Sequence, residues 1–128
     1  MSLKEKLKVM IVDDMSVSRG LLFQALEEIG MKNILSSKSG EEAFGLLTRS
    51  PAHLVISDYN MPGMSGLDLL EKLRRNSGTA KMGFMLVTGT PTPEVLERGR
   101  KLGLNNLVRK PFTSDSLKTS IEAVVGRV

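Results

Sequence analysis

The chain has 128 residues, of which 41% are hydrophobic and 25% charged, with a formal net charge of +4 and no cysteine. This composition is ordinary for a soluble globular protein, and it excludes disulfides and thiolate metal sites. No apolar run approaches the ~20 residues of a membrane-spanning helix, and the polar start of the chain predicts no secretory signal. With one Tyr, four Phe and no Trp, the chain offers little to stack on nucleic-acid bases. We expect one domain over residues 1–128, located in the cytoplasm, that binds neither nucleic acid nor a membrane.

Short apolar segments alternate with helical patterns along the whole chain. This alternation predicts an α/β fold, in which a parallel sheet is covered by helices on both faces. Strands that are buried on both faces read as continuous apolar runs, as these segments do. We expect a doubly wound, five-stranded parallel sheet with strands near Lys8 to Val12, Ile34 to Ser36, Leu54 to Ser57, Phe84 to Val87, and Leu107 to Val108.

Five helices fit between and after these strands, and capping residues predict where they begin. Thr92 is a suitable N-cap because Pro93 follows it at the first helical position, where the missing N–H costs nothing. Ser39 and Glu42 have the spacing of a capping box. The helices are expected to begin at Ser16 as an N-cap, Ser39, Ser65, Thr92, and Thr113 or Ser114, with ends at Gly30, Arg75 and Gly103 for the first, third and fourth.

Polar residues follow or end four of the predicted strands. Asp13 and Asp14 follow the first strand, Asp58 the third, Thr88 the fourth and Lys110 the fifth. Ligands of doubly wound sheets bind outside the carboxyl ends of the strands. We therefore expect three carboxylates, a hydroxyl and an ammonium to converge on one edge of the sheet, as a site for a divalent cation and a phosphoryl group.

The chemistry of this residue set favours Mg²⁺ and a carboxylate nucleophile. Three carboxylates held close repel one another unless a cation lies between them, and Mg²⁺ takes oxygen ligands. A carboxylate can then attack phosphorus, with Lys110 and Thr88 holding the phosphoryl oxygens. The loop after the first strand is acidic, and neither GxGxxG nor GxxxxGK[ST] occurs, which argues against a nucleotide-phosphate cradle.

Sequence motifs at the strand ends resemble those of the receiver domains of two-component response regulators, most closely the single-domain chemotaxis type. The resemblance covers essentially the whole chain, with the motifs in the family's order and spacing. It implies a flavodoxin-like sheet with the strand order 2-1-3-4-5. The motifs are Val12-Asp13-Asp14, Asp58-Tyr59-Asn60-Met61-Pro62-Gly63-Met64-Ser65-Gly66, Val87-Thr88-Gly89 and Val108-Arg109-Lys110-Pro111-Phe112.

The resemblance assigns a metal site and a phosphoacceptor. It implies that Asp58 takes phosphate from the phosphohistidine of a sensor histidine kinase. Asp14 and Asp58 would bind Mg²⁺ through their side chains, Asp13 mostly through a water molecule, and Asn60 through its backbone carbonyl. The resemblance therefore implies a phosphorylation-activated switch rather than an enzyme. The only reactions it would catalyse are its own phosphorylation and dephosphorylation.

The resemblance also implies how the switch works. Thr88 would turn toward the new phosphate, Lys110 would pair with it, and the Lys110-Pro111 bond is usually cis in this family. The downstream protein target, such as a flagellar motor switch, would bind the surface of the fourth helix, fifth strand and fifth helix. This chain departs from the family at Leu107, where an aromatic residue often couples to the threonine. Two prolines also stiffen the loop from Gly89 to Pro93, which moves in relatives. We therefore expect the conformational change on phosphorylation to be smaller or differently located.

Two alternatives to the chemotaxis reading stay open at the level of sequence. A phosphorelay intermediate that passes phosphate to a histidine phosphotransfer protein would carry the same residues. An aspartyl-phosphate phosphatase is disfavoured because it needs an acid two residues after the nucleophile, where this chain has Asn60. A transcription factor is a third option only if the chain is an excised domain, because no helix-turn-helix follows the fifth helix.

Some residues have simpler interpretations. Met61 and Met64 flank the expected phosphorylation loop and could touch a partner. Arg98, Arg100 and Lys101 lie on the fourth helix, where the plainest interpretation is a solvated face, although the corresponding surface contacts outputs in receivers.

Overall fold

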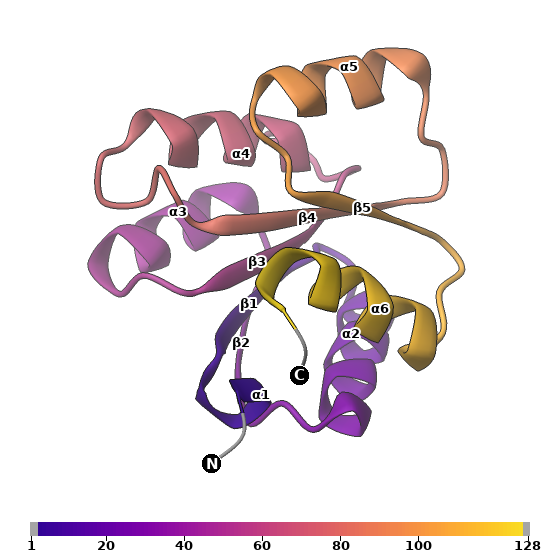
Figure 1. Cartoon of the computed structure of the whole chain (residues 1–128). Coiled ribbons are helices and arrows are strands. Elements are labelled where there is room, and N and C mark those ends of the chain that lie inside the picture. The colour runs from indigo at the N-terminus through magenta and orange to yellow at the C-terminus, as the bar shows by residue number, and fades with distance from the viewer. Residues whose placement is uncertain (1–2, 127–128) are drawn as a thin grey trace.

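The computed structural model describes residues 3–126 and shows a parallel sheet with helices on both faces (Figure 1). The strand order is β2-β1-β3-β4-β5, and every neighbouring pair is parallel. The expected doubly wound sheet and its order are therefore confirmed. The strands are β1 (Lys8–Val12), β2 (Asn33–Ser37), β3 (Leu54–Asp58), β4 (Gly83–Thr88) and β5 (Asn106–Arg109).

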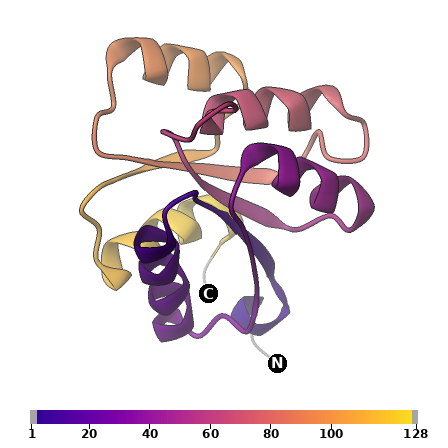
Figure 2. The same ribbon diagram turned by 180° about the vertical axis from the view of Figure 1, so that it is seen from behind.

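Six helices surround the sheet in the described part of the chain, one more than expected. The additional helix, α1 (Leu3–Lys6), is a single turn before β1, too short to give a periodic apolar pattern. Both views place α2 and α6 on one side of the sheet and α3, α4 and α5 on the other (Figure 2). The longer helices are α2 (Ser16–Ile29), α3 (Gly40–Arg49), α4 (Gly66–Arg75), α5 (Pro93–Lys101) and α6 (Ser114–Val125).

The helix caps are partly as expected. Thr92 caps α5 with Pro93 in its first turn, and Thr113 caps α6 in a reciprocal box with Ser116. Ser16, by contrast, is not an N-cap: it is the first residue of α2, and the N-cap position is taken by Met15.

The capping box expected at α3 forms only in part. Ser39 accepts the Glu42 amide as predicted. The Glu42 carboxylate does not return to Ser39, because it accepts hydrogen bonds from the Ser37 hydroxyl at 2.8 Å and the Lys38 amide at 3.2 Å. A complete box instead forms at α4, between Ser65 and Asp68.

Two apolar clusters hold the layers together, one on each face of the sheet. The first joins alternate residues of β1, β3 and β4 to α2 and α6, with Leu26 and Ile121 as fully buried members. The second joins the other strand residues to α3 and α4, with Phe84 at its centre, and reaches α5 at Val95. Met10 and Met85 lie in these clusters as core residues. None of the helices in the described range is long and apolar enough to cross a bilayer.

Candidate functional site

Three carboxylates meet at the carboxyl ends of β1 and β3. One oxygen each from Asp13, Asp14 and Asp58 lies within 4.8 Å of the others. The sheet causes this approach, since Val12 and Ser57 are partners in the β1–β3 ladder, which sets Asp13, just after β1, beside Asp58, the last residue of β3. Asp13 and Asp58 are buried, at 0% and 6% exposure. The expected convergence of these residues is what the structure shows.

The backbone around Asp58 is held on both sides by hydrogen bonds and close packing. The Tyr59 amide donates to the Val87 carbonyl at 3.0 Å, and the Tyr59 carbonyl accepts the Gly66 amide at 3.0 Å. A Cβ at Gly66 would lie 2.5 Å from the Asp58 carbonyl oxygen, so only glycine allows α4 to begin here. The N-terminus of α4 therefore rests directly on the end of β3.

Lys110 supplies the positive charge of the site. Its Nζ lies 2.9 Å from Asp58 Oδ1, and its backbone amide donates to the Thr88 carbonyl at 2.9 Å. The Lys110-Pro111 bond is cis, as the family resemblance implied. Burial raises the pKa of Asp58, and the hydrogen bond and charge of Lys110 oppose that rise. Nearby Asp13 raises it further, so the cluster is short of positive charge.

Two carboxylate oxygens of the cluster are buried without a hydrogen-bond partner within the described residues, Asp13 Oδ2 and Asp14 Oδ1. The other oxygen of Asp13 accepts the Met15 amide at 3.0 Å. Buried carboxylate oxygens without a donor are costly, and a cation is the partner that would satisfy both at once. The donor set is all oxygen, which fits Mg²⁺ rather than a metal that prefers nitrogen or sulfur.

The remaining expected site residues are Thr88 and Asn60. Thr88 ends β4 beside β5, buried, and its Oγ1 accepts the Thr90 amide at 3.1 Å. Its hydroxyl therefore supports the loop that leads to α5. Asn60 is exposed in the loop after β3.

Neighbouring residues add features that the sequence did not predict. Arg19 donates to the Asp13 carbonyl at 2.8 Å and so fixes the turn between β1 and α2. Met61, expected near a partner, is buried in the second apolar cluster, and Met64 packs partly against the same cluster. Leu107 also packs there, as a partly buried residue. A single sequence gave no signal for the Arg19 contact, since it depends on how α2 leaves the sheet.

The sheet order and the acidic cluster with its lysine define the class of receiver domains. The family described as "Response regulator receiver domain" matches residues 9–122, and the chain belongs to this family. Its members are regulatory switches of two-component systems.

Proteins with sequences similar to this chain include chemotaxis proteins. The chain is 45% identical over 126 residues to the "Probable chemotaxis protein CheY" of Rhizobium etli, covering 98% of each chain. It is 35% identical over 121 residues to the CheY homolog of Campylobacter jejuni, covering 94% of this chain and 93% of the relative. The solved structure of CheY4 of Vibrio cholerae superposes with a TM-score of 0.86 at 26% identity, over 92% of this chain and 98% of that one.

Proposed function

We propose that this chain is a phosphorylation-activated switch in which Asp58 accepts a phosphoryl group from the phosphohistidine of a sensor kinase. The observation that carries this proposal is the surroundings of Asp58. Its carboxylate is buried, bonded to Lys110 at 2.9 Å, and adjacent to two carboxylates whose inner oxygens have no partner in the described chain. A site with this charge pattern suits a metal-assisted transfer of phosphate to a carboxylate.

In the proposed reaction an Asp58 carboxylate oxygen attacks the phosphorus of the phosphohistidine. The new O–P bond gives an acyl phosphate as the P–N bond breaks, and the P–N electron pair returns to the imidazole nitrogen, which takes up a proton. Lys110 is placed to pair with phosphoryl oxygens, because its ammonium already lies against Asp58. Thr88, at the end of the adjacent strand, supplies the hydroxyl that would hold another phosphoryl oxygen.

The residues that would hold Mg²⁺ are Asp13, Asp14, Asp58 and the backbone carbonyl of Asn60. When bound, the ion supplies neutralisation of the negative charge that develops on the phosphoryl oxygens. The unpartnered oxygens of Asp13 and Asp14 support this assignment.

The donor must bring its histidine to Asp58, so its docking surface must adjoin the site. Exposed apolar side chains begin directly after Asp14, where Met15, Val17 and Leu21 are 59%, 74% and 56% exposed. A groove of about 590 Å³ lies between α2, which carries Val17 and Leu21, and the loop after Lys110. We place the phosphodonor on this α2 surface.

The output we propose is the binding of a protein target, of the chemotaxis type. The similarity to chemotaxis proteins over almost the whole chain favours this over a phosphorelay. Turnover of external phosphoesters is disfavoured because Asn60 occupies the position where a phosphatase needs an acid. Capture of a motor switch protein only after phosphorylation would support chemotaxis, and return of phosphate to a histidine phosphotransfer protein would support the relay.

The test of phosphorylation is intact-mass spectrometry with a small-molecule phosphodonor. With Mg²⁺ the parent protein should gain one phosphoryl group, and chelation of the metal should abolish the gain. Asp58→Asn should gain none, whereas Asp115→Asn, which changes an exposed carboxylate in the first turn of α6, should behave like the parent. An unchanged mass in the parent would contradict the proposal.

A further inference from the structure

Of the five longer helices, α5 buries the fewest apolar side chains in the described chain. Within the described chain it buries only Val95 and Gly99, whereas α4 buries five residues. It lies at the outer edge of its layer, away from α6 (Figure 1). Leu96 on its outer side is 49% exposed. Apolar burial therefore contributes little to its position, and polar contacts must contribute more.

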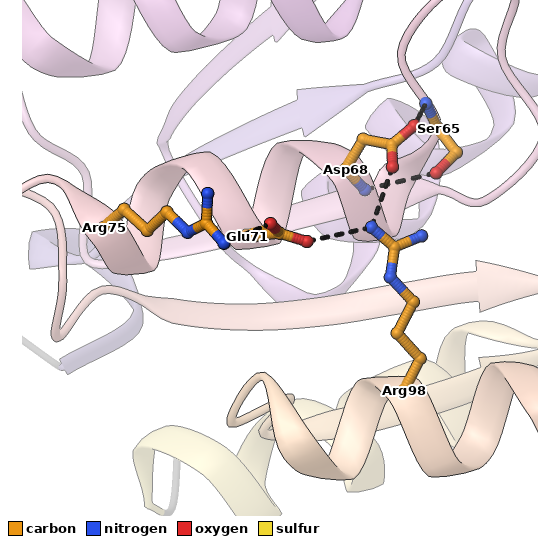
Figure 3. A network of polar contacts seen from close by, with 5 residues as sticks. All are labelled: Ser65, Asp68, Glu71, Arg75 and Arg98. Atoms are coloured by element: carbon orange, nitrogen blue, oxygen red, sulfur yellow. Dashed lines mark hydrogen bonds and ion pairs between the residues drawn. The ribbon is translucent and has the colours of Figure 1, made fainter.

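The side chain of Arg98 joins α5 to α4 (Figure 3). Its Nη2 donates to Asp68 Oδ1 at 2.8 Å and to Glu71 Oε1 at 3.1 Å. The pKa of Asp68 is lowered, chiefly by this hydrogen bond from Arg98. The side chains of Arg98 and Asp68 are 41% and 44% exposed, so these ion pairs are weak enough to be exchanged for water.

Asp68 connects this ion pair to the phosphorylation site. Its second oxygen accepts the Ser65 amide at 3.0 Å, and Ser65 in turn caps the helix by accepting the Asp68 amide. The next residue, Gly66, donates to the Tyr59 carbonyl, directly after Asp58. Arg98 is thus linked to the backbone of Asp58 through a short series of hydrogen bonds.

A second connection reaches α5 from its N-terminal end. Thr88 accepts the Thr90 amide at 3.1 Å and so fixes the start of the loop before α5. In the proposed function Thr88 holds a phosphoryl oxygen on Asp58, and its hydroxyl would then give up the contact with the Thr90 amide. The contacts of Arg98 with α4, and the hydrogen bond from Arg74 of α4 to the Gly103 carbonyl just after α5, would then be the polar restraints that remain on the helix.

We propose that Arg98 is a latch, whose ion pairs with Asp68 and Glu71 hold α5 in the arrangement of the unphosphorylated protein and so oppose the phosphorylated state. This inference rests on the proposed function. It also gives α5 a connection to the site that does not depend on an aromatic residue at position 107. By linkage, a contact that favours one state lowers the affinity for any ligand of the other state by the same factor.

The linkage predicts that removing a native contact increases, rather than decreases, the affinity for a phosphoryl mimic. Breaking the latch should raise the affinity for a phosphoryl mimic, whereas loss of a merely structural contact would leave that affinity unchanged or lower it. Exposed ion pairs of this kind correspond to a factor of about two to five in an equilibrium constant. Tyr59, the single tyrosine of a chain without tryptophan, adjoins Asp58 and serves as a fluorescent reporter.

The experiment is a titration of the full chain with beryllofluoride in the presence of Mg²⁺, followed by Tyr59 fluorescence. Arg98→Gln should bind the mimic about two- to fivefold more tightly than the parent. Arg98→Lys, which keeps the charge, should fall between the two. The matched control is Arg100→Gln, because Arg100 pairs with Glu97 inside α5 and, among the described residues, has no ion pair or hydrogen bond with another element. This control should match the parent.

The outcomes separate the latch from the proposed function. Equal or weaker binding by Arg98→Gln, with the parent phosphorylated normally by intact mass, would overturn the latch alone. An equal gain in Arg100→Gln would also overturn it, because the effect would then belong to charge in general. A parent that takes up neither phosphate nor beryllofluoride would overturn the proposed function, and the latch with it.

Discussion

Helices α5 and α6 flank the same edge strand but are held in different ways. Helix α6 buries Leu117 and Ile121 completely against α2 and the sheet. Helix α5 buries Val95 and a glycine, and it is linked to α4 by the ion pairs of Arg98 with Asp68 and Glu71. Burial of apolar surface is insensitive to charge and to small ions, whereas an exposed ion pair is sensitive to both.

The acidic site resembles α5 in this respect, because its geometry is also governed by charge. Its carboxylates are held by the fold at a distance where they repel one another. Binding of a cation or attachment of a phosphoryl group changes the net charge of the site and therefore this repulsion. The comparison therefore divides the molecule into a part fixed by apolar packing and a part, from the site to α5, that responds to ions.

The largest effect is expected in the apolar part. Leu117→Ala should lower the free energy of unfolding by about 2–5 kcal/mol, because it leaves a cavity at a side chain with 0% exposure. Leu96→Ala on α5 should change it by less than about 0.5 kcal/mol. Urea unfolding of both variants measures the difference. Equal losses would show that α5 is packed as firmly as α6.

Magnesium should stabilise the ion-responsive part. At a hundred times its dissociation constant, Mg²⁺ should raise the free energy of unfolding by about 2.7 kcal/mol, as for any ligand of the native state alone. Asp13→Asn should lose most of this gain, because it alters a carboxylate with an unpartnered buried oxygen. Leu117→Ala should retain the gain in full. Thermal unfolding with and without chelator tests the comparison, and a metal response that survives in Asp13→Asn would contradict it.

Asp58→Asn should stabilise the metal-free protein at neutral pH. Burial raises the pKa of Asp58 in the folded state above its unfolded value. The carboxylate therefore costs no stability below the unfolded pKa; its cost grows as pH rises from the unfolded pKa to the folded pKa and is complete above the folded pKa. In chelator, the advantage of Asp58→Asn over the parent should be absent at acid pH and grow toward neutrality. An advantage that is constant with pH would show that the site does not oppose ionisation.

The smallest expected effect is that of Arg98→Gln on stability. The Arg98 pairs are partly exposed, so their loss should cost about 0.2–1 kcal/mol at low ionic strength. In about 1 M salt, where the screening length is near 3 Å, the difference from the parent should nearly vanish. The loss in Leu117→Ala should persist in the same salt. Denaturant titrations at both ionic strengths measure this, and a salt-independent loss at Arg98 would indicate packing rather than charge.

The parts of the fold that sequence predicted correctly are those governed by local pattern. The apolar runs gave the five strands, and Thr92 with Pro93 gave the start of α5, because each depends on neighbouring residues only. Ser16 was wrong as a cap, since the turn before α2 is held by Asp13, which accepts the Met15 amide. The complete capping box predicted at α3 was wrong because the Glu42 carboxylate accepts hydrogen bonds from Ser37 and Lys38, at the end of β2, instead of the Ser39 amide.

The residues of the candidate site were likewise predictable only where their positions follow from the strands. Strand ends in a parallel sheet must share an edge, so the approach of Asp13, Asp14 and Asp58 followed from the strands. The pairing of Arg98 with Asp68 was not predictable, because the two lie 30 residues apart on separate helices. It depends on how α4 and α5 pack, which apolar periodicity does not specify.

The most direct test of the account is hydrogen exchange across the whole chain with and without beryllofluoride and Mg²⁺. We expect slower exchange in the loops that surround Asp58, faster exchange of the amides of α5 (Pro93–Lys101), and no change in α6 (Ser114–Val125). Equal responses in α5 and α6, or none in either, would contradict the claim that the acidic site is a phosphoryl switch read out at α5.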